Sequence, residues 1–301
     1  MTQMQRRKFL STVAGAAATA PLIAKAKTKT RGDLPPIPQV ALGNTGITTS
    51  RMAQGTGFKG TRRQSDQTRA GFEDFVELMQ HGYERGIRFF DLADQYGSHY
   101  YFREALRHLP REDITILTKM NYRFDDADTT ALTPAQQRHS ARKAIDRFRL
   151  ELDIDVLDVV LMHCVVTPEW DSELAGYIEV LQEYKEKGVI KALGMSAHDL
   201  RALDRATELD WVQIAFTRIN PFGTAMDGTP EEVIPVQRKF KDRGASVVGM
   251  KIFGAGKHVD QCSDCMKFAQ NLGYLDAMTI GARNPEEVDH NIRLMNKYPA
   301  A

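Results

Sequence analysis

Four polar side chains follow three consecutive apolar segments, and together they are suited to proton transfer. Asp91 ends one segment, Tyr96 comes five residues later, Lys119 ends the next segment and His163 ends the third. A buried Lys119 beside the phenol would lower the pKa of Tyr96, and Asp91 would balance the ammonium charge. His163 would then orient a carbonyl oxygen. The group therefore predicts general acid chemistry at a carbonyl.

Each of these side chains also has a purely structural interpretation. An Asp after a strand commonly caps a helix or a turn, and a Lys at that position can extend into solvent. A single His is often a hydrogen-bonded structural residue. The functional hypothesis therefore requires elements that bring all four residues to one place.

Those elements are predicted by a regular alternation of short apolar runs and longer amphipathic segments. Strands buried on both faces are typical of parallel sheets, and eight strand and helix units predict a closed (β/α)8 TIM barrel, an α/β fold of one domain. Catalytic residues of such barrels lie at the carboxyl ends of the strands. The eight apolar runs are 52–57, 88–93, 114–119, 156–163, 190–196, 211–216, 246–251 and 277–281.

An open doubly wound sheet is the alternative architecture. Its dinucleotide-binding fingerprint G-x-G-x-x-G is missing after the first run, where Gly55-Thr-Gly57 is only a partial match. Ahead of that run, residues 43–49 and their flanks predict a small hairpin that caps the bottom of the barrel. Amphipathic helices are expected between the runs, for example over 71–85, 134–151, 174–187, 230–243 and 285–298.

In residue type, order and strand, the four polar residues resemble the catalytic tetrad of the aldo-keto reductases. The segment 188–196 is similar to that family's fifth-strand motif, and 280–287 is similar to its cofactor phosphate loop. The resemblance extends from about Leu42 to Met295. It implies reversible, NADP(H)-dependent reduction of an aldehyde, ketone or sugar carbonyl, with Tyr96 giving the proton to the carbonyl oxygen.

The resemblance also implies how the coenzyme is held. Ser196 and Gln213 would bind the carboxamide of the nicotinamide, and Arg283 would pair with the 2′-phosphate unless it is only a surface charge. No metal site is expected. The coenzyme-binding residues that we expect are Gly57, Ser196, Gln213, Met250, Lys251, Gly281, Arg283, Glu287 and Asn291.

Several positions depart from the family pattern. Ala197 and His198 follow Ser196, where many relatives carry a second carboxamide ligand, Asn. Met250-Lys251 replaces an aromatic residue that would stack on the nicotinamide ring, and Met250 would pack there instead. His290-Asn291 stands where relatives often have Glu-Asn near the adenine.

The composition predicts a folded globule and excludes several other classes. Of 301 residues, 42% are hydrophobic, and 40 Lys and Arg against 39 Asp and Glu leave no basic excess for nucleic acid. Three cysteines are too few for a disulfide scaffold or a metal site of four thiolates. Cys262 and Cys265 are spaced to form a disulfide or redox pair or half of a metal site, or they are two ordinary residues at a helix start.

The first residues have the layout of an export signal. Arg6-Arg7-Lys8-Phe9-Leu10 is followed by an Ala-rich apolar run and by Ala24-Lys25-Ala26, which resembles a twin-arginine signal peptide over residues 1–26. The alternative is a basic tail on a cytoplasmic protein. We expect a linker over 27–37, the barrel over 38–301, and a periplasmic protein without another membrane span.

Export affects which partners are expected. The twin-arginine machinery would be one partner, and a small carbonyl compound would be the substrate. Because nicotinamide coenzymes are scarce outside the cytoplasm, the protein would need a tightly held coenzyme, an unidentified redox partner or a cytoplasmic fraction. Two other functions stay open: a barrel that binds a nucleotide or carbonyl ligand without turnover, and a cofactor-free lyase or isomerase on the same fold.

Overall fold

The computed structural model describes residues 34–122 and 132–301, and Leu34–Ala301 forms one compact unit. The expected signal peptide, residues 1–26, lies outside the described residues. Most of the expected linker, 27–37, lies outside them too, and its last residue, Ile37, is packed in the core with only 4% of its surface exposed.

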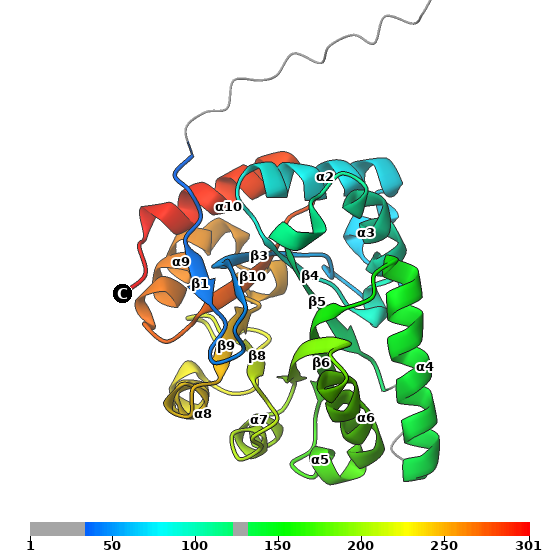
Figure 1. Ribbon diagram of the computed structural model, residues 1–301. Coiled ribbons are helices and arrows are strands. Elements are labelled where there is room, and N and C mark those ends of the chain that lie inside the picture. Colours follow the sequence, from blue (N-terminus) through cyan, green and yellow to red (C-terminus); the bar gives the residue numbers. More distant parts are fainter. Residues whose placement is uncertain (1–33, 123–131) are drawn as a thin grey trace, which may run out of the picture. The chain divides into compact units, whose positions relative to one another are not determined.

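Within the described residues, eight parallel strands close into a barrel, in the order β10-β3-β4-β5-β6-β7-β8-β9. The predicted (β/α)8 barrel is therefore confirmed, and the open sheet is excluded (Figure 1). The strands are β3 (Met52–Gly55), β4 (Phe89–Asp91), β5 (Thr115–Met120), β6 (Leu157–Val165), β7 (Ile190–Ala197), β8 (Ile214–Arg218), β9 (Ser246–Met250) and β10 (Ala277–Gly281).

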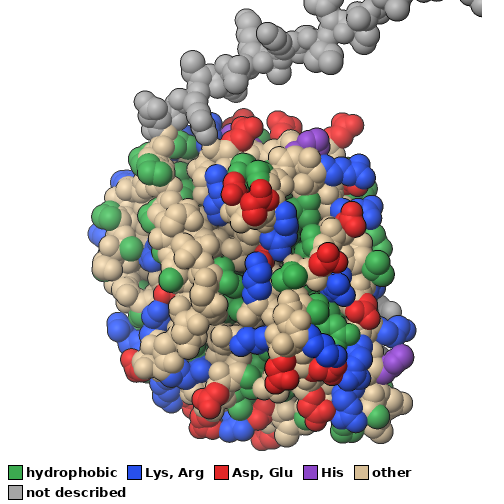
Figure 2. Space-filling model, in the orientation of Figure 1, with side chains coloured by type: hydrophobic (Ala, Val, Ile, Leu, Met, Phe, Trp, Pro, Cys, Tyr) green, Lys and Arg blue, Asp and Glu red, His purple; other side chains and the backbone are tan. Residues whose placement is uncertain are grey.

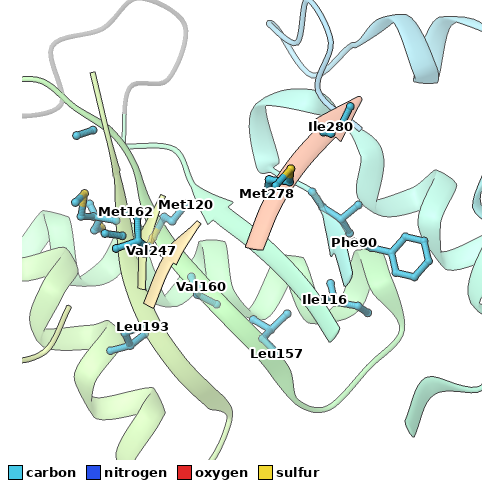
Figure 3. Packing of buried hydrophobic residues seen from close by; sticks show 14 of the residues in the cluster. Phe90, Ile116, Met120, Leu157, Val160, Met162, Leu193, Val247, Met278 and Ile280 are labelled. Atoms are coloured by element: carbon cyan, nitrogen blue, oxygen red, sulfur yellow. The ribbon is translucent and has the colours of Figure 1, made fainter. Parts of the chain in front are cut away.

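Alternate residues of each strand point to opposite sides of the barrel wall. One apolar cluster fills the barrel and takes, for example, Val159 and Leu161 from β6 and Ile214 and Phe216 from β8. A second cluster joins the outer side of the strands to the helices, and Figure 3 shows part of it around Val160. Polar residues that continue the inner alternation therefore reach the carboxyl end of the barrel.

The helices begin at recognisable caps and cover the outside of the barrel. Thr133 and Thr229 form capping boxes in front of α4 and α8, and each is followed by a proline. The helices are α1 (Asp66–Arg69), α2 (Phe72–Glu84), α3 (Ser98–Leu106), α4 (Pro134–Leu152), α5 (Trp170–Glu173), α6 (Ala175–Glu186), α7 (Leu200–Ala206), α8 (Pro230–Asp242), α9 (Cys262–Asn271) and α10 (Pro285–Lys297). Single 3₁₀ turns occur at η1 (Asp94–Tyr96), η2 (Arg111–Asp113), η4 (Gly254–Gly256) and η5 (Val259–Gln261).

The expected hairpin is present as β1 (Gln39–Ala41) and β2 (Thr48–Ser50), which pair antiparallel. Its turn inserts Leu42 into the apolar cluster inside the barrel. Asn44 donates its N–H to the carbonyl oxygen of Gly244, which precedes β9 (3.0 Å). The hairpin therefore closes the amino end of the barrel. The carboxyl ends of the strands, where the predicted catalytic residues lie, are at the opposite end.

The sixth strand begins later than predicted. We expected it over 211–216, whereas β8 comprises Ile214–Arg218. The chain leaves α7 through a turn in which Val212 donates to the carbonyl oxygen of Leu209 (3.0 Å), so pairing starts only beyond that turn. Register with β9 then continues to Arg218, which lies opposite Met250.

Charged side chains of both signs are interspersed on the face shown in Figure 2. In the described ranges, no helix has the length and apolar character needed to cross a membrane. The same residues contain no cluster of three or more His, Cys, Asp or Glu arranged for a metal ion. Cys262 and Cys265 are both free thiols.

Candidate active site

A buried ion pair lies at the carboxyl ends of neighbouring strands. Asp91 ends β4, and Lys119 of β5 donates from its Nζ to Asp91 Oδ1. Only 5% and 1% of the two residues are exposed. Lys119 also donates to the carbonyl oxygen of Leu92 (3.0 Å), and Thr279 donates its hydroxyl to Asp91 Oδ2 (2.9 Å). These extra hydrogen bonds compensate for removing two charges from water.

Tyr96 stands beside this ion pair at the end of η1. The centroid of its ring is 4.9 Å from Lys119 Nζ and 5.7 Å from the ring of His163, at an interplanar angle of 86°. The ring lies against Gly57, where an added Cβ would be 2.3 Å from Tyr96 Cε2. The expected contact of Gly57 with the coenzyme stays a prediction, and the structure shows in addition that Gly57 makes room for the ring of Tyr96.

The Tyr96 phenol is held in its protonated form. Burial raises its pKa well above the usual value, and the charges of Asp91 and Cys164 raise it further. The prediction of a lowered Tyr96 pKa is therefore wrong, because burial of the phenol, together with the charge of Asp91, has a larger effect than the neighbouring Lys119. A phenol that keeps its proton at neutral pH is in the state that a proton donor requires.

His163, in β6, is held neutral. Burial lowers its pKa well below the usual value, and the positive charges of Lys119 and Lys251 add to this effect. The residue is 4% exposed, and its Nδ1 makes no hydrogen bond to any part of the chain that the structure describes. A neutral imidazole carries one donor and one acceptor, so it can orient a carbonyl oxygen without adding charge.

Ser196 of β7 lies next to the strand that carries His163. Its Oγ accepts the N–H of Cys164 (2.9 Å), and it is 1% exposed. Cys164 has a positive φ of 59°, and the register between β6 and β7 shifts here. This irregularity places Cys164 Sγ 3.5 Å from His198 Nε2, a contact that spacing alone did not predict.

Met250 follows the inner alternation of β9 to the same end of the barrel, and Lys251 comes directly after the strand. Met250 belongs to the apolar cluster inside the barrel, and Lys251 has a φ of 57°. Burial and the charge of Arg218 lower the pKa of Lys251. Arg218, the last residue of β8, is paired with Asp227. Arg218 was not among the predicted site residues because the expected strand, 211–216, ended two residues before it.

Gln213 does not join this group. It precedes β8, and its side-chain oxygen accepts the N–H of Leu193 (3.3 Å). Ser196 pairs with Phe216, which lies three residues beyond Gln213 in the chain. The expectation that Gln213 and Ser196 hold one carboxamide stays a prediction, and it would require Gln213 to reach the coenzyme while its oxygen is bonded to Leu193.

The expected phosphate-binding residues gather where β10 leads into α10. Gly281 ends β10, and Asn284 caps α10 by accepting the N–H of Glu287 (2.9 Å). Arg283 donates from Nε and Nη2 to Glu287 Oε1 (3.2 and 2.8 Å), on the exposed surface. Asn291, one turn further, is 6% exposed. A helix amino terminus and a guanidinium fit a phosphate, although Glu287 competes for the guanidinium.

The family model described as "Aldo/keto reductase family" matches residues 53–262 of this sequence. The chain belongs to the aldo-keto reductase family. The match covers the strands that bring Asp91, Tyr96, Lys119 and His163 together, from β3 to β9. Members of the family use nicotinamide coenzymes, and the donor groups of Ser196 and Arg283 fit such a coenzyme.

Individual relatives of this aldo-keto reductase are distant. The sequence is 27% identical over 194 residues to an NADH-specific methylglyoxal reductase of Escherichia coli, covering 60% of this chain and 59% of that one. It is 22% identical to a D-threo-aldose 1-dehydrogenase of a Pseudomonas species, and that match covers 60% of this chain and 59% of the relative. The chain therefore spans about three-fifths of the length of these curated relatives.

Solved structures show the same fold. An aldo-keto reductase from Bacillus halodurans, in its holo form, superposes with a TM-score of 0.69. The superposition covers 88% of this chain and 93% of that chain at 19% identity. At 19% identity, this comparison shows that the two proteins share the barrel fold, and it shows nothing about function.

Proposed function

We propose that this protein is an NADPH-dependent oxidoreductase that reduces an aldehyde, ketone or sugar carbonyl to an alcohol. The observation that carries the proposal is the meeting of a protonated Tyr96 with a neutral His163 and the Lys119–Asp91 ion pair. Ligand binding alone needs no phenol that is held protonated beside a buried ammonium. This arrangement distinguishes an enzyme from a barrel that only binds its ligand.

Each residue has a definite task in the proposed reaction. Tyr96 gives its hydroxyl proton to the carbonyl oxygen as the carbon–oxygen double bond is reduced. His163 orients that oxygen, and Lys119 with Asp91 sets the electrostatic field around the phenol. The bound coenzyme supplies the hydride to the carbonyl carbon. Ser196 would hold the nicotinamide carboxamide through its hydroxyl, which has no acceptor among the described residues.

The choice of NADPH over NADH depends on Arg283, which would pair with the 2′-phosphate as a bidentate fork. Glu287 now occupies that fork and could instead accept the ribose 2′-hydroxyl of NADH. The Escherichia coli relative is NADH-specific. The proposal for NADPH therefore requires Arg283 to be shared with, or released from, Glu287 when the coenzyme binds.

A coenzyme titration tests the proposal. Quenching of protein fluorescence is followed as NADPH, and then NADP⁺, is added to the wild-type protein and to Tyr96→Phe. We expect both proteins to bind, and only the wild type to oxidise NADPH with a test aldehyde, with a loss of roughly 10²- to 10⁴-fold in the variant. Absence of binding at micromolar coenzyme would contradict the proposal and favour a cofactor-free lyase or isomerase.

We also propose export by the twin-arginine route to the periplasm, on the basis of Arg6-Arg7 and the apolar run that follows. The test is cell fractionation of the full chain and of a variant with both arginines changed to lysine. We expect the wild type in the periplasmic fraction and the variant in the cytoplasm. Equal distribution of the two proteins would contradict the proposed route.

A further inference from the structure

A buried ionic cluster anchors the turn that ends in Tyr96. Asp94 begins this turn and is 2% exposed. Arg147 of α4 binds both of its carboxylate oxygens, with Nη1 2.8 Å from Oδ1 and Nη2 2.7 Å from Oδ2. Arg63 donates to the same carboxylate at 3.0 Å. One short turn is therefore held by two guanidinium groups from distant parts of the chain.

The cluster continues from Asp94 to the strand that carries Lys119. Glu151 Oε1 accepts from both Arg63 (2.6 Å) and Arg147 (3.1 Å). Glu151 Oε2 lies 2.8 Å from His99 Nδ1, and the other ring nitrogen of His99 lies 2.7 Å from the hydroxyl of Thr118. Thr118 is fully buried, and the next residue in β5 is Lys119.

The charges in this cluster are balanced. The two buried carboxylates, Asp94 and Glu151, each bind two guanidinium groups, so neither negative charge is buried without a partner. Burial alone would raise the pKa of Glu151, but the hydrogen bond with His99 and the charge of Arg147 lower it to about 2. Removing Arg147 would leave the buried carboxylates of Asp94 and Glu151 with Arg63 as their one remaining guanidinium partner among the described residues, which weakens the hold on the turn.

The cluster lies on the helix side of the barrel wall, behind the site. Lys119 points into the barrel, and Thr118 points outward, where α3 packs beside α4 (Figure 1). The backbone of Arg63 also covers the residue after Tyr96, because a Cβ at Gly97 would be 2.0 Å from the Arg63 carbonyl oxygen. The turn is therefore fixed from two sides.

We propose that Asp94, Arg63, Arg147, Glu151, His99 and Thr118 form a positioning network that holds the Tyr96 phenol against Lys119 and keeps water away from it. This inference rests on the proposed role of Tyr96 as proton donor. None of the six residues carries out chemistry. They act through the turn η1 and through strand β5, the two elements that present Tyr96 and Lys119.

The titration of Tyr96 reports whether the network acts in this way. The titratable groups that face the phenol are Asp91, Lys119, His163 and Cys164. None of them belongs to the network. If the network loosens, water reaches the phenol, and the burial that raises its pKa is lost. Tyr96 would then lose its proton at a lower pH, and the alkaline limit of carbonyl reduction would move to lower pH with it.

The experiment compares Arg147→Met with Arg142→Met, which removes a surface partner of Glu183 (2.7 Å) from the same helix. Thr118→Val removes the hydroxyl next to Lys119, and Thr118→Ser keeps it. For each variant, kcat, the Kd for NADPH and the ultraviolet titration of Tyr96 are measured. The titration is taken as the difference from the same protein carrying Tyr96→Phe.

We expect kcat of Arg147→Met to fall about tenfold or more, since small misplacements of reacting groups have large effects. Tyr96 should titrate at lower pH, and the Kd for NADPH should stay within about twofold. Thr118→Val should change kcat and the titration in the same direction, while Thr118→Ser and Arg142→Met should behave as wild type. An unchanged Tyr96 titration in both Arg147→Met and Thr118→Val would overturn the proposal.

The titration also separates this inference from the proposed function. If the wild-type protein reduces no carbonyl but Tyr96 still titrates lower in Arg147→Met, the proposed function fails and the network stands. If reduction is established but both variants retain the wild-type kcat and titration, the network fails and the proposed function stands.

Discussion

The ring of Tyr96 fits against Gly57 so closely that a Cβ at residue 57 would lie 2.3 Å from Cε2 and 2.4 Å from Cζ. Gly60 lies at the other edge of the ring, where a Cβ would be 2.4 Å from Cδ1. The loop after β3 therefore forms a slot for the phenol, which only residues without a side chain can line.

Gly57→Ala should displace Tyr96 and lower kcat by about tenfold or more, because the proton donor would move away from Lys119. The measurement is kcat together with the Kd for NADPH. Gly82→Ala in α2 is the control, since its Cβ would meet only Ile87 at an ordinary 3.4 Å. If Gly57→Ala keeps its kcat but binds NADPH more weakly, Gly57 contacts the coenzyme as first predicted.

Lys119→Met should destabilise the fold by about 3 to 5 kcal/mol, because it leaves the carboxylate of Asp91 buried without its partner. The double variant Asp91→Asn with Lys119→Met removes both charges and should recover part of this loss. Urea unfolding at neutral pH measures both effects. Equal stability of the single and double variants would contradict the explanation that the unpaired carboxylate of Asp91 causes the loss.

Arg283→Met should weaken NADPH binding by roughly 10- to 100-fold, the effect of one charge-assisted interaction, and should leave NADH binding nearly unchanged. Glu287→Gln frees the guanidinium and should tighten NADPH binding. Both coenzymes are titrated by fluorescence against each variant. Loss of NADH binding in Glu287→Gln, with no gain for NADPH, would indicate instead that Glu287 binds the ribose hydroxyl.

Gln213→Leu should leave the Kd for NADPH unchanged, whereas Ser196→Ala should weaken binding several-fold. Gln213 lies roughly 10 Å along the strand from the level of Ser196 and bonds to the backbone of Leu193. The substitution should cost about 1 to 3 kcal/mol of stability, because the Leu193 N–H loses its acceptor. Weaker coenzyme binding by Gln213→Leu would instead support the role implied by the family.

Glu151→Gln should destabilise the protein at neutral pH and reduce its sensitivity to acid. The pKa of Glu151 is lowered from 4.5 to about 2, so its ionisation stabilises the fold above pH 4.5. This stabilisation, about 3 kcal/mol, is lost as the pH falls from 4.5 through 2. Urea midpoints over this range should converge for wild type and variant. If the urea midpoints of the two proteins instead stay equally far apart from pH 4.5 to pH 2, the lowered pKa of Glu151 is contradicted.

The fold was predictable because its signals are local. Each strand is a short run buried on both faces, and eight such runs alternating with amphipathic helices leave the closed barrel as the natural arrangement. The proximity of Asp91, Lys119 and His163 was also predictable, because the carboxyl ends of parallel strands lie at the same end of the barrel for any conformation of the loops. The boundary of β8 was not, because a turn after α7 delays its pairing.

The sequence by itself determined the barrel and the identity of the residues at its carboxyl end. Only the tertiary structure decided which neighbours they meet: Gly57 against Tyr96, Gln213 turned toward Leu193, and Glu151 joined through His99 to Thr118. These contacts depend on strand register and loop geometry between residues up to 52 positions apart. The spacing of residues along the chain does not predict these contacts. Because the contacts are buried, each of them affects the stability of the fold or the pKa of a side chain.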